Sequence, residues 1–483
     1  MIKLILGALS SIFLIVSITI IYYWRDIQYD PSSLDLLSYF IVLPLVLSLI
    51  LLAPYLIYQA YHAYKLRKQQ QAIALLEQQS NKEIPEANEK VEDVKWLNLH
   101  IFSSSAFSAF GENEAIIDEM KNFKSPELDH SLTHGDGLPV LSYRITALDN
   151  VLEQQNDEEE MEEKQERLQR ILALIQHPLE QQSEILLQVG EHLKQSAFFY
   201  DSELAYQYHM HPAWNNLDFS VSDPTSNEEK WELQVEQIPR LNRLNIHILL
   251  SDSLLHVWDE HFSERMLLNF MQSLGIISQH MHIEHYFINQ QSSYENWLNL
   301  LKKISTQSHE VSLMINVDSE IDQEWLDEKI WLSDHYSDHY LATEFASSWC
   351  VAAQDLKINN AEPIKSLKIA FNVHDLASCL DQAVPHHAEY TQQEQPFVLV
   401  LNDATDIRVI KQTNQIFAPT LIETYHLLYT QQNFGHTQSL AKIFSFMLGV
   451  HMPKDLIAMV HSIDQVSTHA IFQTVAGSNK FEK

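Results

Sequence analysis

Two long apolar segments at the start of the chain constrain its fold more than any other feature. The first, Leu4 to Tyr23, is almost entirely apolar and holds no charged residue. The second, Leu36 to Tyr61, is interrupted only by Pro44 and Pro54. A helix of about 20 apolar residues is long enough to cross the hydrocarbon core of a bilayer. We therefore predict a two-span transmembrane anchor over residues 1–68.

The residues that flank these segments predict their orientation. A cleaved signal peptide would need a shorter apolar core and a small-residue cleavage site, and residues 20–24 provide neither. Lys3 precedes the first span, and three basic residues within 65–68 follow the second. The loop 25–35 holds one basic and three acidic residues, so both termini are expected in the cytoplasm. Neither span has an ionisable residue in its middle, which favours a plain anchor over a transport pathway.

The rest of the chain is strongly acidic. The whole sequence of 483 residues has a net charge of −33, and residues 69–483, with 26 basic and 61 acidic side chains, carry −35. Phosphate backbones repel such a body, so we expect no nucleic-acid partner. Only two cysteines occur, Cys350 and Cys379, which suits a reducing compartment. Both fall in apolar segments and are expected to be inert core thiols.

The soluble part is expected to consist of a polar linker over 69–93 and one α/β domain over 94–483. Apolar runs that alternate with amphipathic stretches predict a helix-covered sheet. The predicted strands are 95–102, 140–145, 245–251, 283–289, 311–317, 347–353, 367–373, 397–401 and 469–475. The predicted helices are 168–175 (ended by Pro178), 183–196, 262–274, 294–304, 373–382, 407–415, 419–429 and 437–448.

The order of these elements, with several short motifs, resembles the thiolase-like fold of β-ketoacyl synthases over residues 95–476. Asn433-Phe434-Gly435-His436-Thr437 resembles the motif that carries one catalytic histidine of that family. Val400-Leu401-Asn402-Asp403-Ala404-Thr405 resembles the strand end that carries the other. Glu344-Phe345-Ala346 resembles the Glu-Gly-Ala turn, and 311–318 resembles the strand that ends in Val-Asp-Ser.

The departures from the family pattern predict a loss of catalysis. Where the family has its nucleophilic cysteine, this chain reads Gln290-Gln291-Ser292-Ser293. Asp403 replaces the first histidine and Gln431 the usual lysine, so only His436 remains. Decarboxylative condensation needs a thiolate to hold the acyl group and two imidazoles to stabilise developing negative charge. A serine without a base is a weak nucleophile, and Asp403 would repel an oxyanion.

The resemblance is closer to a degenerate branch of this fold found among accessory components of bacterial type VI secretion systems. The segment 137–148, Gly-Leu-Pro-Val-Leu-Ser-Tyr-Arg-Ile-Thr-Ala-Leu, carries that likeness. It implies an α/β, thiolase-like, layered αβαβα body, and the two apolar segments predict that two transmembrane helices precede this body in the bacterial inner membrane. Such a protein would be catalytically inactive and would act by protein–protein contact in a membrane-associated assembly, and a homodimer is the expected state. The alternative is a membrane-bound acyl-transfer or acyl-binding enzyme with a rearranged active site.

The remaining groups of polar residues in the sequence predict no further site. Histidines occur 25 times, and the groups His280/His282/His285, His335/His339, His386/His387 and His209/His211 have spacings that a metal could use. None has the dense pattern of a strong metal motif, and phosphate-binding loops and a nucleophile elbow do not occur. We therefore assign no catalytic residue, no cofactor-binding residue and no metal ligand, and expect no cofactor.

Overall fold

The computed structural model describes residues 95–475 with interruptions, together with scattered positions between 16 and 43. The interruptions are 135–136, 156–165, 211–237, 332–340, 374–375, 384–397, 421, 432–433, 435–439, 453–457 and 465–466. The chain divides into two compact units, Met1–Glu92 and Asp93–Lys483, and all the elements below belong to the second. Among the described residues, no helix has the length and apolar character needed to span a bilayer. The two predicted spans fall almost wholly, and the linker 69–93 wholly, outside those residues.

The second unit is built on one sheet whose ten main strands fall into two halves of five. The first half comprises β1 (Trp96–Ser108), β5 (Arg243–Ser251), β6 (Met281–Ile288), β7 (Glu310–Ser319) and β8 (Ala342–Ala353). The second half comprises β9 (Lys365–Phe371), β10 (Val398–Val400), β11 (Leu427–Tyr429), β12 (Ala458–Ile463) and β13 (Ser467–Thr474). The short strands β2 (Gly111–Glu112), β3 (Glu127–Thr133) and β4 (Pro139–Tyr143) pair at the side of the first half.

The two halves repeat the same strand order. The first half runs β6-β5-β7-β8-β1 and the second β11-β10-β12-β13-β9, and antiparallel pairing of β1 with β9 joins them. In each half the first three strands are parallel, and the last two pairings are antiparallel. The sequence shows no short-period repeat that reveals this duplication. Two halves with different residues can have the same strand order, because strand pairing needs only a similar apolar pattern.

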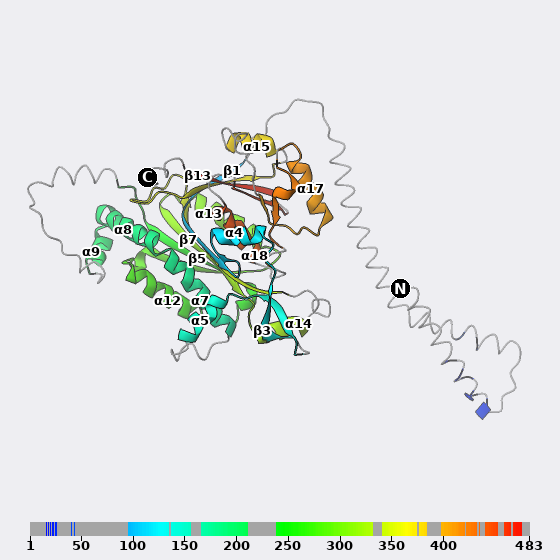
Figure 1. Cartoon of the computed structure of the whole chain (residues 1–483). Coiled ribbons are helices and arrows are strands. Elements are labelled where there is room, and N and C mark those ends of the chain that lie inside the picture. Colours follow the sequence, from blue (N-terminus) through cyan, green and yellow to red (C-terminus); the bar gives the residue numbers. More distant parts are fainter. Residues whose placement is uncertain are drawn as a thin grey trace, which may run out of the picture. The chain divides into compact units, whose positions relative to one another are not determined.

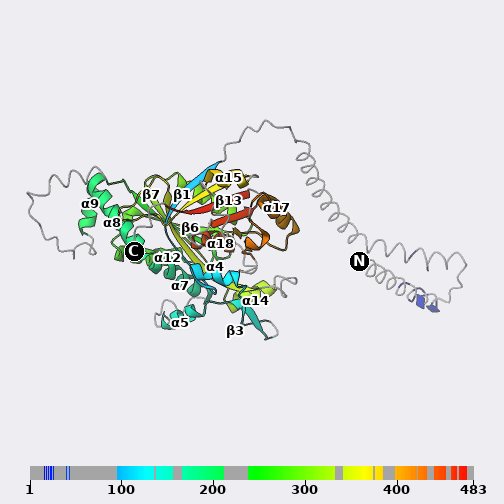
Figure 2. The ribbon, with the colours of Figure 1, turned by 45° about the horizontal axis from the view of Figure 1, so that its top comes forward.

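Helices lie on both faces of the sheet. The helices are α4 (Glu114–Lys121), α5 (Thr146–Gln155), α7 (Glu166–Gln181), α8 (Ser183–Tyr200), α9 (Ser202–Met210), α12 (Glu260–Ser273), α13 (Ser293–Ser305), α14 (Gln323–Trp331), α15 (Leu376–Ala383), α17 (Ile407–Phe417) and α18 (Ala441–Met447). Short 3₁₀ turns are η2 (Asp252–Leu254), η3 (Ser278–His280), η4 (Thr424–His426) and η5 (Leu448–His451). Figure 1 shows the sheet curling around α4, α13 and α18, with α7 and α12 outside one half and α15 and α17 outside the other, and Figure 2 agrees.

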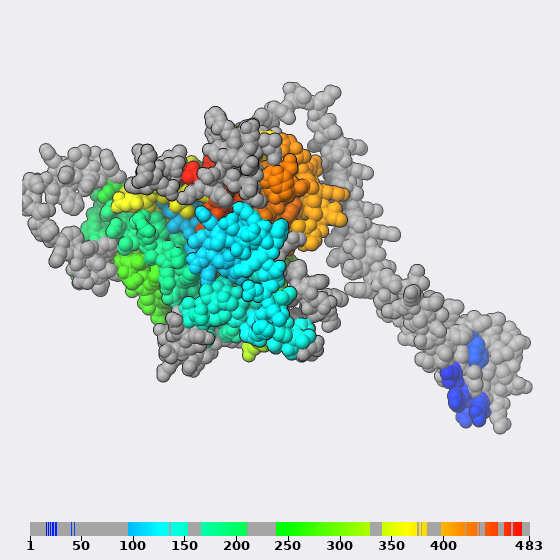
Figure 3. Space-filling view, in the orientation of Figure 1, coloured from blue at the N-terminus to red at the C-terminus, as the bar shows by residue number. Residues whose placement is uncertain are grey.

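Three hydrophobic clusters correspond to this layering. A central cluster joins α4, α13 and α18 to the inner face of both halves. A second cluster joins α7, α8 and α12 to the outer face of the first half, and a third joins α15 and α17 to that of the second. The layers therefore run helix, sheet, helix, sheet, helix, and the fold is mixed α/β. On the surface, the cyan segment that includes α4 and the β3–β4 hairpin lies between the green helices of the first half and the orange part of the second (Figure 3).

Two of the helix predictions are wrong. Pro178 does not end its helix, because α7 continues to Gln181 and the amide of Gln182 donates to the carbonyls of Pro178 and Leu179. A proline in the last turn removes one helical hydrogen bond but leaves the following residues free to complete the turn. The predicted helix 419–429 is instead η4 followed by β11, since Leu427–Tyr429 extends the ladder of β10 at the sheet edge.

Candidate functional site

A polar cluster lies where the ends of β12 and β13 meet the first turns of α13 and α18. It consists of Tyr294, Lys442, Ser462, Asp464 and Thr468. The ammonium of Lys442 lies 2.6 Å and 2.7 Å from the two carboxylate oxygens of Asp464, and the Ser462 hydroxyl donates to the same carboxylate at 2.8 Å. The Tyr294 and Thr468 hydroxyls are 2.5 Å apart, and the Lys442 ammonium lies 5.5 Å from the centre of the Tyr294 ring.

In this polar cluster each charge is paired and each hydroxyl group is hydrogen-bonded. Burial raises the pKa of Tyr294, and the nearby Asp464 carboxylate acts in the same direction, so the phenol stays protonated. The side chains of Lys442 and Asp464 are 20% and 31% exposed, so water weakens their attraction. Lysine and aspartate neutralise each other, and the hydroxyl groups are hydrogen-bonded. The arrangement holds α13 and α18 to β12 and β13 and provides no activated base.

The position that the sequence resemblance matches to a nucleophile holds serines that are used by the local turn. The Ser292 hydroxyl donates to Asn289 Oδ1 at 2.8 Å and accepts from Asn296 Nδ2 at 3.1 Å. The Ser293 hydroxyl donates to the Gln290 carbonyl at 3.3 Å. Such bonds are typical of serine and asparagine at the beginning of a helix. Among the described residues, neither hydroxyl has a histidine or carboxylate partner, which an activated serine requires.

Asn402 and Asp403 likewise have structural partners. The Asn402 side chain donates to the Ile463 carbonyl at 3.0 Å and accepts from the Ile463 amide at 2.6 Å, which joins the end of β10 to β12. The Asp403 carboxylate accepts from the Thr405 amide at 2.8 Å and from its hydroxyl at 2.6 Å. Gln431 is exposed. Asn402 therefore lies beside the polar cluster, whereas Asp403 contacts only the local turn that includes Thr405.

The histidine motif is described only at Phe434, since Asn433, Gly435, His436 and Thr437 lie outside the described residues. Phe434 is 2% exposed, and its ring centre lies 5.1 Å from that of Phe444 in α18. Its carbonyl accepts from the Thr343 hydroxyl at 3.4 Å. The one described residue of the motif is therefore a core residue.

Aromatic rings fill the interior behind the polar cluster. Trp297 of α13, Trp349 of β8, Phe446 of α18 and Phe472 of β13 form an aromatic core, and each is at most 2% exposed. Their ring centres lie 5.7–6.0 Å apart in five pairs. These are ordinary distances for packed aromatic side chains. The space between α13, α18 and the sheet is occupied by side chains at this depth.

The segment around Glu344 is predicted to form a turn, but the structure shows a strand there. Glu344 to Ala346 lies inside β8, and the Glu344 side chain is fully buried. Arg170 of α7 donates to both Glu344 oxygens at 2.6 Å and 2.8 Å and also to Asp149 at 2.5 Å. Burial alone would lower the pKa of Arg170, but Glu344 and Asp149 outweigh this and raise it. Sequence reasoning missed this pair because its partners are 174 residues apart.

The cysteines and histidines behave mostly as core residues. Cys350 and Cys379 are both buried, as predicted, and burial raises the pKa of Cys350 to about 12. His280 lies in η3 and not on the strand with His282, while His285 bonds to the Ser263 hydroxyl at 2.9 Å. The pairs 335/339 and 386/387 and His211 fall outside the described residues. In the part of the chain that the structure describes, no three His, Cys, Asp or Glu side chains are placed to hold a metal ion.

No protein-family model and no curated protein matches the chain. Among solved structures, it is similar to the ishigamide ketosynthase/chain length factor, at 12% identity over 78% of this chain and 100% of that chain, with a TM-score of 0.42. It is also similar to the ketosynthase from module 6 of the bacillaene synthase from Bacillus subtilis 168, at 10% identity over 78% of this chain and 72% of that chain, with a TM-score of 0.40. A β-ketoacyl synthase from Burkholderia phymatum STM815 matches at 11% identity over 78% of this chain and 99% of that chain, with a TM-score of 0.39. These structural neighbours are ketosynthases.

Proposed function

We propose that this protein is a membrane-anchored, catalytically inactive ketosynthase-like protein that acts as an interaction scaffold in a membrane-associated assembly. The observation that carries the proposal is the aromatic core formed by Trp297, Trp349, Phe446 and Phe472. A condensing enzyme needs an open channel for its acyl chain, whereas a scaffold can fill that space with side chains. Packed rings contribute stability through buried area, and no substrate fits between these four described rings.

The partners of the two serines support the same proposal. A nucleophile works when an adjacent base accepts its proton and when donors stabilise the oxyanion. Ser292 bonds to two asparagines and Ser293 to a backbone carbonyl. Asp403, where the family has a histidine, accepts hydrogen bonds from Thr405 and brings negative charge. A role in a type VI secretion apparatus and a homodimeric state rest on the sequence resemblance alone.

The test compares acylation with cellular function. Full-length protein is incubated with an acyl thioester and its mass is measured intact, beside the Ser292→Ala and Ser293→Ala variants. We expect no acyl adduct on any of them. In a deletion strain, Ser292→Ala and His436→Ala should restore function at matched protein levels. An adduct that Ser292→Ala abolishes, or loss of function by a folded His436→Ala protein, would favour the acyl-transfer enzyme.

The anchor is tested separately. A reporter that is active only in the periplasm, fused after Lys483, should stay inactive because basic residues flank the paired apolar segments. The same reporter placed within the loop 25–35 should be active. A periplasmic signal from the C-terminal fusion would contradict the predicted topology. The fragment 94–483 should be soluble and should not sediment with anionic vesicles, because its net charge is strongly negative.

A further inference from the structure

Phe123 occupies a position at which the backbone favours glycine. It follows the last turn of α4, its φ is +53°, and its side chain is 80% exposed. Its amide donates to the Met120 carbonyl at 3.1 Å, and the amide of Lys124 donates to the Glu119 carbonyl at 3.2 Å. These two bonds are those of a Schellman cap, whose left-handed residue is usually glycine because a Cβ is strained there. Phenylalanine therefore costs stability through its backbone, and its exposed ring recovers little of that cost by burial.

Two leucines of the β3–β4 hairpin extend the apolar surface. Leu128 and Leu141 are directly opposite each other across the two strands and are 52% and 49% exposed. Leu141 is on the same side of β4 as Tyr143, whose hydroxyl donates to the Lys124 carbonyl at 3.2 Å. That bond joins this side of the hairpin to the residue next to Phe123. We call Phe123, Leu128 and Leu141 the apolar ridge, and the part of the chain that carries it is cyan in Figure 3.

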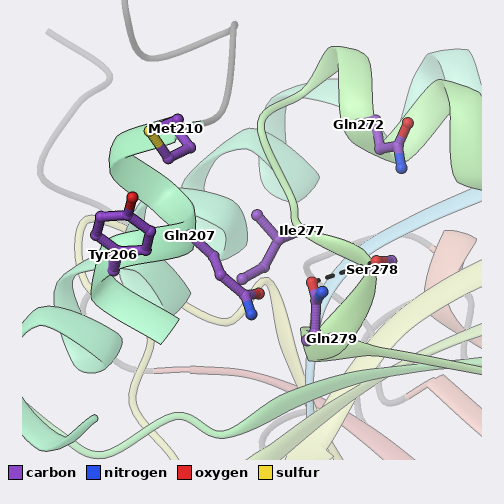
Figure 4. A pocket seen from close by; sticks show the side chains of 7 residues that line it. All are labelled: Tyr206, Gln207, Met210, Gln272, Ile277, Ser278 and Gln279. Atoms are coloured by element: carbon purple, nitrogen blue, oxygen red, sulfur yellow. Dashed lines mark hydrogen bonds between the residues drawn. The ribbon is translucent and has the colours of Figure 1, made fainter. Parts of the chain in front are cut away.

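The apolar side chains exposed beside α9 have no such continuity. Tyr206 and Met210 are 66% and 64% exposed at an open hollow of about 390 Å³ between α9 and the turn into η3 (Figure 4). Amides and a hydroxyl group separate the apolar side chains there, since the other lining residues are Gln207, Gln272, Ile277, Ser278 and Gln279. Isolated exposed apolar residues are common on protein surfaces, whereas a cluster of them indicates an interaction site.

The opposite face of the hairpin is already covered by a helix. Val140 of β4 packs with Leu132 of β3 and Leu326 of α14 in a small hydrophobic cluster. Leu128 and Leu141 alternate with these residues along the strands and so point to the other side, where half of each side chain is exposed. Sheets in globular proteins pack their apolar faces against helices or other sheets. A helix on the side of Leu128 and Leu141 would give the hairpin the same cover on both faces.

The charges around the apolar ridge are mostly negative. Residues 112–128 carry five acidic and two basic side chains. The two basic groups bond within the body, Lys121 to Asp118 at 3.4 Å and Lys124 to a backbone carbonyl at 2.9 Å. The carboxylate of Glu127, in the strand that carries one of the leucines, is exposed. A second copy of this chain would bring like charges together here, whereas a segment rich in lysine or arginine would meet carboxylates.

We propose that the apolar ridge binds a basic amphipathic helix of a partner protein. The apolar side of that helix packs on Leu128 and Leu141 and against the Phe123 ring, and its flanking lysine or arginine side chains face the carboxylates around the ridge. An exposed aromatic side chain on a strained backbone position is suited to anchor a partner, because the cap fixes the direction in which the ring projects before the partner binds. The inference deepens the scaffold proposal and rests on it, since it names the surface that a partner of the scaffold binds.

The test is photocrosslinking of the full-length protein in the cells that produce it, with p-benzoylphenylalanine in place of Leu141. We expect a light-dependent adduct to a different protein, in a peptide that has a net positive charge and apolar residues three and four positions apart. Adding Phe123→Gly should lower the yield about tenfold, whereas Ile407→Ser, which removes a side chain that is 66% exposed at the start of α17, should not. Glu127→Lys should also lower the yield, whereas Glu362→Lys, at an exposed position just before β9, should leave it unchanged.

The melting temperature separates a binding role of Phe123 from a folding role. Phe123→Gly should melt about 1–2 °C higher than the wild type, because glycine adopts the left-handed backbone without strain. A variant that loses the adduct and melts no lower than the wild type has lost a contact with the partner and not its fold. A melting temperature clearly below that of the wild type would show that the ring stabilises the body, and it would overturn the role of Phe123 as an anchor.

Several outcomes overturn the proposed site. An adduct to a second copy, to another segment of the same chain or to an acidic peptide contradicts the proposed occupant, and the absence of any adduct contradicts the docking surface itself. A yield that survives Phe123→Gly contradicts the apolar ridge. These outcomes leave the scaffold proposal standing, because a scaffold can bind its partner at another surface, and because that proposal fails on acyl-adduct formation instead.

Discussion

Four buried histidines should make the body sensitive to mild acid, and His461 is the best one to perturb. Its imidazole is fully buried, stacks on His469 with ring centres 4.6 Å apart, and lies edge-on to Phe417. Burial, followed by the proximity of His469, lowers the pKa of His461 from 6.5 to about 3. The folded state therefore binds fewer protons than the unfolded state at pH values between these two.

The sign and the size of the effect follow from proton linkage. Stability from this histidine is fully present above pH 6.5 and is lost as the pH falls from 6.5 toward 3. Between pH 7.5 and 5.0 the loss amounts to about 2 kcal/mol for one histidine. His247, His280 and His451 have pKa values lowered to about 4 by burial and add similar losses. Losses at four histidines together are therefore a substantial part of the stability of a typical domain.

The assay is urea unfolding at pH 7.5 and pH 5.0, followed by tryptophan fluorescence, to which the buried Trp297 and Trp349 contribute. The His461→Phe variant should lose about 2 kcal/mol less than the wild type over this interval, whatever its stability at pH 7.5. His261→Phe is the control, because the His261 side chain is 99% exposed and should leave the wild-type loss unchanged.

The carboxylate of Asp129 acts in a different pH window from the buried histidines. Burial alone would raise the pKa of Asp129, but bonds from Arg144 and Ser131 hold it at about 2. Asp129 therefore contributes stability that is lost only as the pH falls below 3.8. A wild-type protein whose unfolding free energy is the same at pH 7.5 and 5.0, or a His461→Phe variant with the wild-type loss, refutes the reasoning.

Further substitutions test the packing and the ion pairs. Arg170→Ala should cost about 3–5 kcal/mol in urea unfolding because Glu344 is left buried and unpaired, while Arg170→Met combined with Glu344→Met should recover most of that loss. Lys442→Gln should cost at most about 1 kcal/mol and lose its effect at high salt, since the Lys442–Asp464 pair is partly exposed. Gly449→Ala should cost about 1–3 kcal/mol in thermal unfolding, because its new methyl group would lie 2.3 Å from the Phe472 ring. A Gly449→Ala protein that melts with the wild type would show that the ring moves freely.

The sequence by itself determined those elements whose pattern is strong and local. The helix predicted over 294–304 is α13 at Ser293–Ser305, and the strand predicted over 245–251 is β5 at Arg243–Ser251. An apolar face that repeats every three to four residues over a dozen residues favours a helix strongly, and a short apolar run rich in isoleucine and leucine between polar segments favours a buried strand. The cysteines could also be placed in the core, because free cysteine in an apolar run has little reason to lie elsewhere.

The tertiary structure decided what depends on partners distant in the chain. Residues 427–429 form a strand because the edge of β10 offers them a ladder, although their own pattern also suits a helix. The polar cluster could not be predicted from the sequence for the same reason. Tyr294 and Lys442 come together only when α13 and α18 pack against each other inside the curled sheet. The duplication of the two halves is likewise a property of strand pairing. Local pattern fixes which face of an element is apolar, but the energy that selects its neighbour comes from burial between segments far apart in the sequence.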